Sequence, residues 1–88
     1  MMRPPESPDM PPVNTIDCEG LLCPLPVLKA RKHLMTMAAG SVLLVRATDP
    51  MAAIDMPHFC TEAGHILLET RQDGPVQIYH IQRGPNKN

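Results

Sequence analysis

The change from a first strand to a first helix is encoded in the stretch Gly20-Leu21-Leu22-Cys23-Pro24-Leu25-Pro26-Val27. Each of its two prolines fixes φ near the helical value and lacks an N–H group, so both suit the first turn of a helix. The glycine opens the turn before them, and the rigid segment places Cys23 at the N-terminus of the helix. The residues expected to support this cysteine are Gly20, Pro24, Leu25 and Pro26.

The position of Cys23 predicts sulfur chemistry. Unsatisfied N–H groups and the positive end of the helix dipole favour an anion at a helix N-terminus. We expect the amides of Leu25 and Val27 to face the sulfur and to lower the thiol pKa, which increases the fraction of nucleophilic thiolate. Cys23 is therefore the candidate catalytic residue.

A strand and a helix are predicted on the two sides of this stretch. Residues 13–18 alternate, with Ile16 and Cys18 on one face, as in a half-buried strand. Residues 24–38 have the helical period and precede a stop at Ala39-Gly40. The apolar face of this helix consists of Val27, Ala30, Leu34, Met35 and Ala38, and the polar face of Lys29, Lys32, His33 and Thr36. Arg31 falls in the apolar sector, where it must extend to solvent or pair with a carboxylate.

The second half of the chain predicts one strand, one helix and a hairpin. Residues 41–47 form an apolar run typical of a central strand. Thr48-Asp49-Pro50 signals the start of a helix, in which Pro57 should introduce a kink or a restart. The inward residues of this helix are predicted to be Ala52, Met56, Phe59, Cys60 and Ala63. Residues 65–72 and 76–83 are strand-like and flank a turn at Asp73-Gly74-Pro75.

This order predicts an α/β (α+β) two-layer sandwich with βαβαββ topology and two helices on one face of a four-stranded mixed sheet. The domain is expected to span residues 13–84. Residues 1–12 contain five of the 11 prolines and are predicted to be a disordered tail, and residues 85–88 a polar tail.

Composition excludes several classes of function. In a chain of 88 residues, chemistry is expected near the surface. A net charge of −1, one Phe, one Tyr and no Trp argue against direct binding of nucleic acid. The sequence has no apolar run that would span a membrane and no signal-peptide centre, so a cytoplasmic location and protein partners are expected.

The remaining cysteines and histidines predict neither a disulfide framework nor a metal site. The three cysteines form no CxxC pair, and His58, Cys60 and His65 match no zinc-binding spacing. Cys60 is expected in the core, and Cys18 either in the core or as a resolving thiol for Cys23. No cofactor is expected. Lys29, Lys32 and His33 form either a solvated helix face or a surface that steers an acidic partner.

The chain resembles the TusA-like (SirA-like) sulfur carriers, which are defined by a CPxP motif. The resemblance includes residues 20–27 and also Arg31-Lys32, Gly40, Thr48-Asp49-Pro50, residues 55–60 and Asp73-Gly74. It implies the βαβαββ fold and a sulfurtransferase role for Cys23. This cysteine would accept persulfide sulfur from a cysteine desulfurase or another donor and pass it to an acceptor protein.

The resemblance implies several routes for the sulfur. The best-known members serve the synthesis of 2-thiouridine in tRNA, and others serve dissimilatory sulfur metabolism or the supply of molybdenum cofactor. Many tRNA-thiolation members have Glu where this chain has Leu25, which is expected to leave Cys23 at least as acidic and to offer an apolar docking contact. A regulatory protein-binding module without sulfur transfer is the alternative from another class.

Overall fold

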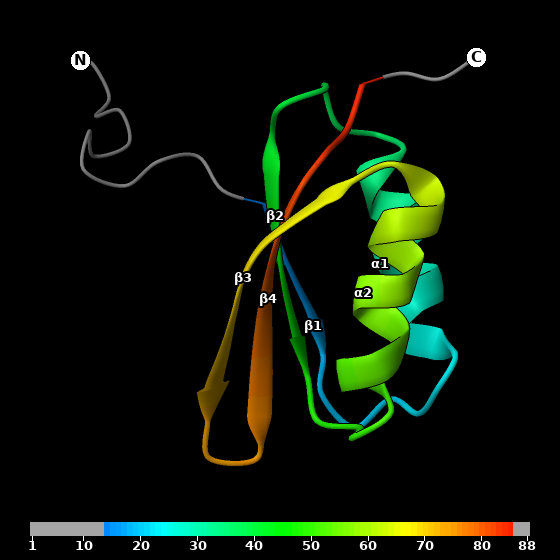
Figure 1. The fold of residues 1–88 in the computed structure, drawn as a ribbon. Helices are drawn as coiled ribbons and strands as arrows, with labels where there is room; N and C mark the ends of the chain where they lie inside the picture. Colours follow the sequence, from blue (N-terminus) through cyan, green and yellow to red (C-terminus); the bar gives the residue numbers. More distant parts are fainter. Residues whose placement is uncertain (1–13, 86–88) are drawn as a thin grey trace, which may run out of the picture.

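The computed structural model describes residues 14–85 as a four-stranded sheet with two helices on one face (Figure 1). The elements are β1 (Asn14–Cys18), α1 (Leu25–Leu34), β2 (Val42–Ala47), α2 (Ala52–Ala63), β3 (Ile66–Asp73) and β4 (Val76–Gln82). The sheet order is β1-β2-β4-β3, with β1 parallel to β2 and the other pairs antiparallel. The predicted fold class is confirmed. The tails predicted at 1–12 and 85–88 lie outside the described residues, except for Pro85.

The core lies between the helices and the two central strands. Burial alternates along β2 and β4, so that Leu43 and Val45 on β2 meet Tyr79 and Ile81 on β4 beneath the helices. Because β2 pairs with β1 on one side and β4 on the other, its apolar run belongs to a central strand, as predicted. Within residues 14–85, neither helix combines the length and apolar character that crossing a membrane requires.

Helix α1 ends earlier than its sequence pattern predicts. The last helical residue is Leu34, and the expected core residue Met35 is 72% exposed. The N–H and hydroxyl groups of Thr36 both donate to the carbonyl of His33, and Nε of Arg83 donates to the carbonyl of Leu34. These bonds satisfy the last carbonyls of the helix, so the chain turns before reaching Ala38.

Helix α2 is one uninterrupted helix that includes Pro57, so the predicted restart is wrong. Proline leaves the carbonyl four residues earlier, that of Ala53, without its helical donor. Ala53 is exposed, so water can reach this position. The predicted inward face is confirmed, since Ala52, Met56, Phe59 and Cys60 are buried.

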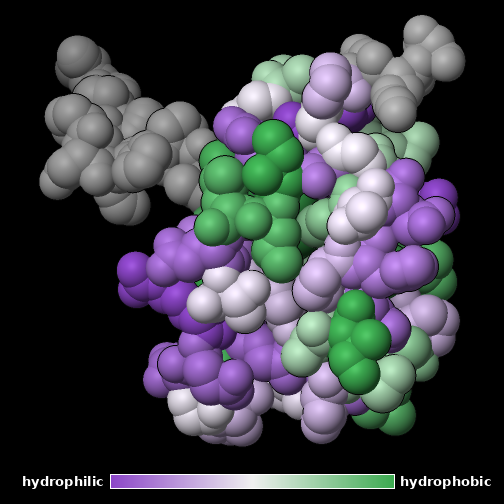
Figure 2. All heavy atoms as spheres, viewed as in Figure 1, coloured by the Kyte–Doolittle hydropathy of each residue, from purple (hydrophilic) through white to green (hydrophobic). Residues whose placement is uncertain are grey.

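The β3–β4 hairpin leaves one edge of the sheet poorly covered. Gly74 has φ +60° in the two-residue loop before Val76, so the predicted turn is confirmed. The register of β3 shifts between Leu67 and Glu69, and the exposed Leu68 lies at this irregularity. Figure 2 shows a hydrophobic area over this part of the sheet, and the large exposed apolar residues of β3 are Ile66 and Leu68.

Candidate functional site

Cys23 is an exposed residue in the connection between β1 and α1. The Cys23–Pro24 peptide bond is cis, and Pro24 is the N-cap of α1. Pro26 is buried in the first turn, where its ring fixes the helix start against the protein interior. The sequence thus correctly predicted an exposed sulfur at the beginning of a helix.

The turn before Cys23 is tied to the end of β2. Gly20 has φ +82°, a conformation that suits glycine, and its N–H group donates to Oγ1 of Thr48 at 2.8 Å. Thr48 belongs to the segment expected to signal the start of α2, and its hydroxyl accepts this bond from the cysteine-bearing connection. The β1–α1 and β2–α2 connections are therefore held together at the same end of the sheet.

Asp49 is the residue that fixes the backbone of Cys23. Its Oδ2 accepts the Cys23 N–H at 2.6 Å, and its Oδ1 accepts the N–H of Met51 at 3.1 Å. The Asp49 carbonyl accepts Nε2 of Gln77, whose Oε1 accepts the hydroxyl of Tyr79. Asp49 is 9% exposed, so its contacts join the cysteine to α2 and to the buried centre of β4.

Asp55 contacts the sulfur itself. Sγ of Cys23 donates to Oδ2 of Asp55, in the first turn of α2, at 2.7 Å. This hydrogen bond raises the pKa of the Cys23 thiol, and removal from water and the negative charges of Asp55 and Asp49 raise it further. The predicted lowering of the thiol pKa is therefore wrong. The amide of Leu25, expected to face the sulfur, donates instead to the carbonyl of Leu22 at 2.8 Å.

The roles of Asp49 and Asp55 were not predicted from the sequence. These residues lie 26 and 32 positions after Cys23, so no local pattern connects them with the sulfur. Both belong to the segments that carry the family resemblance, Thr48-Asp49-Pro50 and residues 55–60. Two signals in the sequence were available: an aspartate directly after a central strand, and a second aspartate in the first turn of the helix that follows. In a βαβ unit both positions lie beside the β1–α1 connection.

Large exposed apolar side chains flank the residues of this polar centre along the chain. Leu22 and Leu25, on either side of Cys23 in the chain, are 68% and 46% exposed. Met51 and Ile54 are exposed near Asp49 and Asp55, and Leu28 is exposed one turn along α1. We call Leu22, Leu25, Leu28, Met51 and Ile54 the apolar rim. Exposed apolar side chains gathered around a reactive group are typical of a protein-docking surface.

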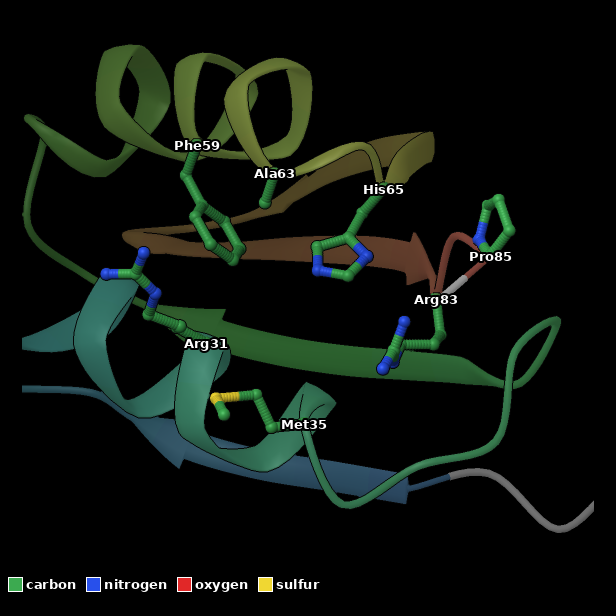
Figure 3. A pocket seen from close by; sticks show the side chains of 7 residues that line it. All are labelled: Arg31, Met35, Phe59, Ala63, His65, Arg83 and Pro85. Atoms are coloured by element: carbon green, nitrogen blue, oxygen red, sulfur yellow. The ribbon is translucent and has the colours of Figure 1, made fainter. Parts of the chain in front are cut away.

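The basic residues of α1, expected to form either a solvated face or a surface that steers an acidic partner, line a hollow that does not include Cys23. Lys29, Lys32 and His33 line a hollow on α1 together with Ile16 of β1 and Thr36. Arg31, predicted to extend or to pair, is exposed. It borders a second hollow with Asp55 and Phe59, and a third with His65 and Arg83, which Figure 3 shows between the two helices and the end of β4.

The other two cysteines are buried. Cys18 is in the core, which favours core packing over a role as resolving thiol, and burial raises its pKa. Burial also raises the pKa of Cys60 to about 11. Nδ1 of His65 accepts the N–H of Gly84, and residues 14–85 contain no group of three His, Cys, Asp or Glu side chains arranged for a metal ion.

Fold and site together define a small α/β protein that presents one reactive cysteine on a surface suited to protein docking. The family model described as "Sulfurtransferase TusA" matches residues 14–83. The chain belongs to this TusA family, whose members are sulfur carriers working in sulfur relay.

Individual relatives agree with this assignment. The chain is 40% identical over 75 residues to the sulfur carrier protein TusA of Pseudomonas putida (strain GB-1), an alignment that covers 85% of this chain and 94% of the relative. It is 51% identical over 62 residues to a putative sulfur carrier protein of Neisseria meningitidis, covering 69% and 84%. The crystal structure of a SirA-like protein from Desulfitobacterium hafniense matches with a TM-score of 0.72 and 28% identity, covering 82% of this chain and 97% of that one.

Proposed function

We propose that Cys23 is the sulfur-carrying residue and that the protein acts as a sulfurtransferase between a persulfide donor and an acceptor protein. The observation that carries this proposal is the exposure of Cys23 within an apolar rim, while Cys18 and Cys60 are buried. An incoming donor sulfur must reach the nucleophile directly, and among the three cysteines Cys23 alone offers that access. The CPxP motif that supports it is the hallmark of the family.

The transfer requires two exchange steps. In the first, the Cys23 thiolate attacks the terminal sulfur of the donor persulfide, forms a new S–S bond and releases the donor cysteine as a thiolate. In the second, an acceptor thiolate attacks the terminal sulfur on Cys23, and Cys23 leaves as a thiolate. One sulfur atom is transferred in each step, and no cofactor takes part.

Mass spectrometry after incubation with a cysteine desulfurase and free cysteine tests this proposal. The intact protein should gain the mass of one sulfur atom, and a reducing agent should remove it. The variant Cys23→Ala should gain none, while the matched control Cys60→Ala should still be loaded. Loading that persists without Cys23 would assign the sulfur to another residue and overturn the proposal.

The route we propose is the sulfur relay for 2-thiouridine in tRNA, with a cysteine desulfurase as donor, a downstream relay protein as acceptor and a cytoplasmic location. Dissimilatory sulfur metabolism and molybdenum-cofactor supply are the competing routes. Reconstitution with purified desulfurase and relay proteins separates them. Transfer of labelled sulfur from Cys23 to the tRNA-thiolation relay supports the first route, and a loaded protein that transfers none contradicts it.

A binding module without sulfur transfer is the second candidate, and the exposed apolar rim is the observation that favours it. Binding measurements with a purified desulfurase distinguish the two functions. A module would bind its partner equally with and without Cys23 and would acquire no sulfur. A carrier would acquire sulfur that depends on Cys23.

A further inference from the structure

Carboxylates from two elements meet the reactive cysteine. Asp49, after β2, accepts a hydrogen bond from the backbone N–H of Cys23, and Asp55, on α2, accepts one from its thiol. Both oxygens of Asp49 are already engaged by backbone N–H groups, those of Cys23 and Met51. Asp55 is therefore the carboxylate placed beside the atom that a donor sulfur must approach.

The other charged groups near α2 do not change this placement. Arg31, His58 and Glu62 line a hollow together with Asp55, and His58 lies 3.9 Å from Glu62. Among residues 14–85, Arg31 and Asp55 form no ion pair with each other. Lys29 and Lys32 line the hollow on the β1 side of α1. The apolar rim carries no charge. The negative charge of Asp49 also acts on the thiol, but the charge in direct contact with Sγ is that of Asp55.

We propose that Asp55 is a specificity-determining residue, which makes Cys23 react preferentially with a sulfur donor that presents a positive charge beside its own reacting sulfur. The inference rests on the proposed function of Cys23 and adds the chemical class of the donor surface. That surface is a cysteine-bearing segment with lysine or arginine next to the persulfide and apolar residues that cover the rim.

The physical reason is the charge that develops during the reaction. Before Cys23 attacks, the thiol proton that is hydrogen-bonded to Oδ2 of Asp55 must pass from Sγ to a solvent base. This breaks the S–H bond and places a thiolate beside a carboxylate. Two negative charges in contact repel each other, and a cation brought by the donor is attracted to both. A donor with a negative group at the same place would add a third negative charge. The carboxylate thus slows unsuitable donors as well as favouring suitable ones.

Small symmetrical disulfides test this inference without any partner protein. The reagents are cystamine, which carries two ammonium groups, bis(2-hydroxyethyl) disulfide, which is neutral, and 3,3′-dithiodipropionate, which carries two carboxylates. In each reaction the Cys23 thiolate forms a bond to one sulfur, the reagent S–S bond breaks and the other half leaves as a thiolate. The rate of reaction at Cys23 is measured by peptide mass mapping at fixed pH and low salt. It is divided by the rate at which 2-mercaptoethanol reacts with the same reagent.

For the wild-type protein we expect a preference of roughly fivefold for the cationic reagent over the neutral one, and a similar factor against the anionic one. In Asp55→Asn these ratios should approach one. Glu69→Gln is the matched control, because it removes one negative charge from the exposed Glu69–Arg71 pair on β3 and should retain the wild-type preference. Equal ratios in the wild-type protein and Asp55→Asn would overturn the inference.

Salt provides a second test that does not depend on the folding of a variant. In the wild-type protein the preference for the cationic reagent should collapse at about 1 M salt, where charges are screened within a few ångströms. A preference that survives such salt would contradict an electrostatic origin. These results are independent of sulfur loading: absence of a persulfide on Cys23 would reject the proposed function, whereas absence of a charge preference would reject only the role of Asp55.

Discussion

Cys23 and Cys60 are two thiols in different regions of the molecule, and the pKa of each is raised. On the buried face of α2, desolvation raises the pKa of Cys60 to about 11. At the surface, the main cause of the raised pKa of Cys23 is its hydrogen bond to Asp55. Burial persists for as long as the protein is folded, whereas a contact with an accessible carboxylate can be broken or neutralised by a partner. The comparison therefore separates an inert thiol from one that docking can activate.

The largest expected difference between the two thiols is in alkylation of the native protein. Iodoacetamide at neutral pH should modify Cys23 at least about a hundredfold faster than Cys60, because Cys60 becomes accessible only when the structure opens. Peptide mass mapping over time measures both rates, and denatured protein provides the control in which the rates converge. Comparable native rates would show that Cys60 is not protected and would remove the basis of the comparison.

The anchor of the Cys23 region is expected to have the next largest effect. Asp49→Ala leaves the N–H groups of Cys23 and Met51 without their acceptor, so the free energy of unfolding should fall by about 1–3 kcal/mol. Urea denaturation followed by circular dichroism measures the change. Asp17→Ala is the control, because Asp17 is exposed and its carboxylate accepts one exposed N–H, that of Glu19. An equal effect of both variants would contradict the anchoring role of Asp49.

Alkaline pH should lower the stability of the protein through a buried thiol, that of Cys60. Above pH 9.0 the unfolded chain releases the Cys60 proton while the folded protein keeps it, so the free energy of unfolding should fall as the pH rises from 9.0 toward 11. Urea denaturation at a series of pH values measures this slope. It should be shallower in Cys60→Val, where no proton is released at this position. The same slope in both proteins would assign the pH dependence to other groups, such as Tyr79.

The smallest expected effect is at the exposed thiol. Asp55→Asn removes the charge and weakens the hydrogen bond that raises the pKa of Cys23, so its alkylation rate should begin to rise at a lower pH than in the wild-type protein. The pH profile of iodoacetamide modification at Cys23 measures this shift. Glu62→Gln, on an exposed part of the same helix, should leave the profile nearly unchanged. A profile displaced to higher pH in Asp55→Asn would contradict the role assigned to the carboxylate.

The sequence predicted elements well where local rules decide them. The proline pair marked the start of α1, and Asp73-Gly74-Pro75 marked the hairpin, because both follow from the φ angles that these residues allow. Local rules failed at the end of α1. There Arg83, 49 residues after Leu34, donates to its carbonyl. A hydrogen bond between residues this far apart leaves no periodic pattern in the sequence.

The site was predicted only as far as the cysteine itself. The exposure of Cys23 at a helix N-terminus follows from residues 20–27. Its thiol pKa does not, because the local sequence pointed only to the helix dipole as an electrostatic influence on the sulfur. Asp55 reaches the sulfur by the packing of α2 beside α1, and Asp49 by the crossover from β1 to the parallel strand β2. The family resemblance marked both segments but assigned them no role.

The sequence by itself determined the order of elements, the inward faces of β1 and of α2, and the presentation of Cys23, because these depend on periodicity and on backbone conformation within a few residues. Only the tertiary structure decided where α1 ends and which charges surround the sulfur. Hydrogen bonds and electrostatic forces act over distances in space, and residues that are 26 and 32 positions apart from Cys23 come within reach of it only after the chain has folded.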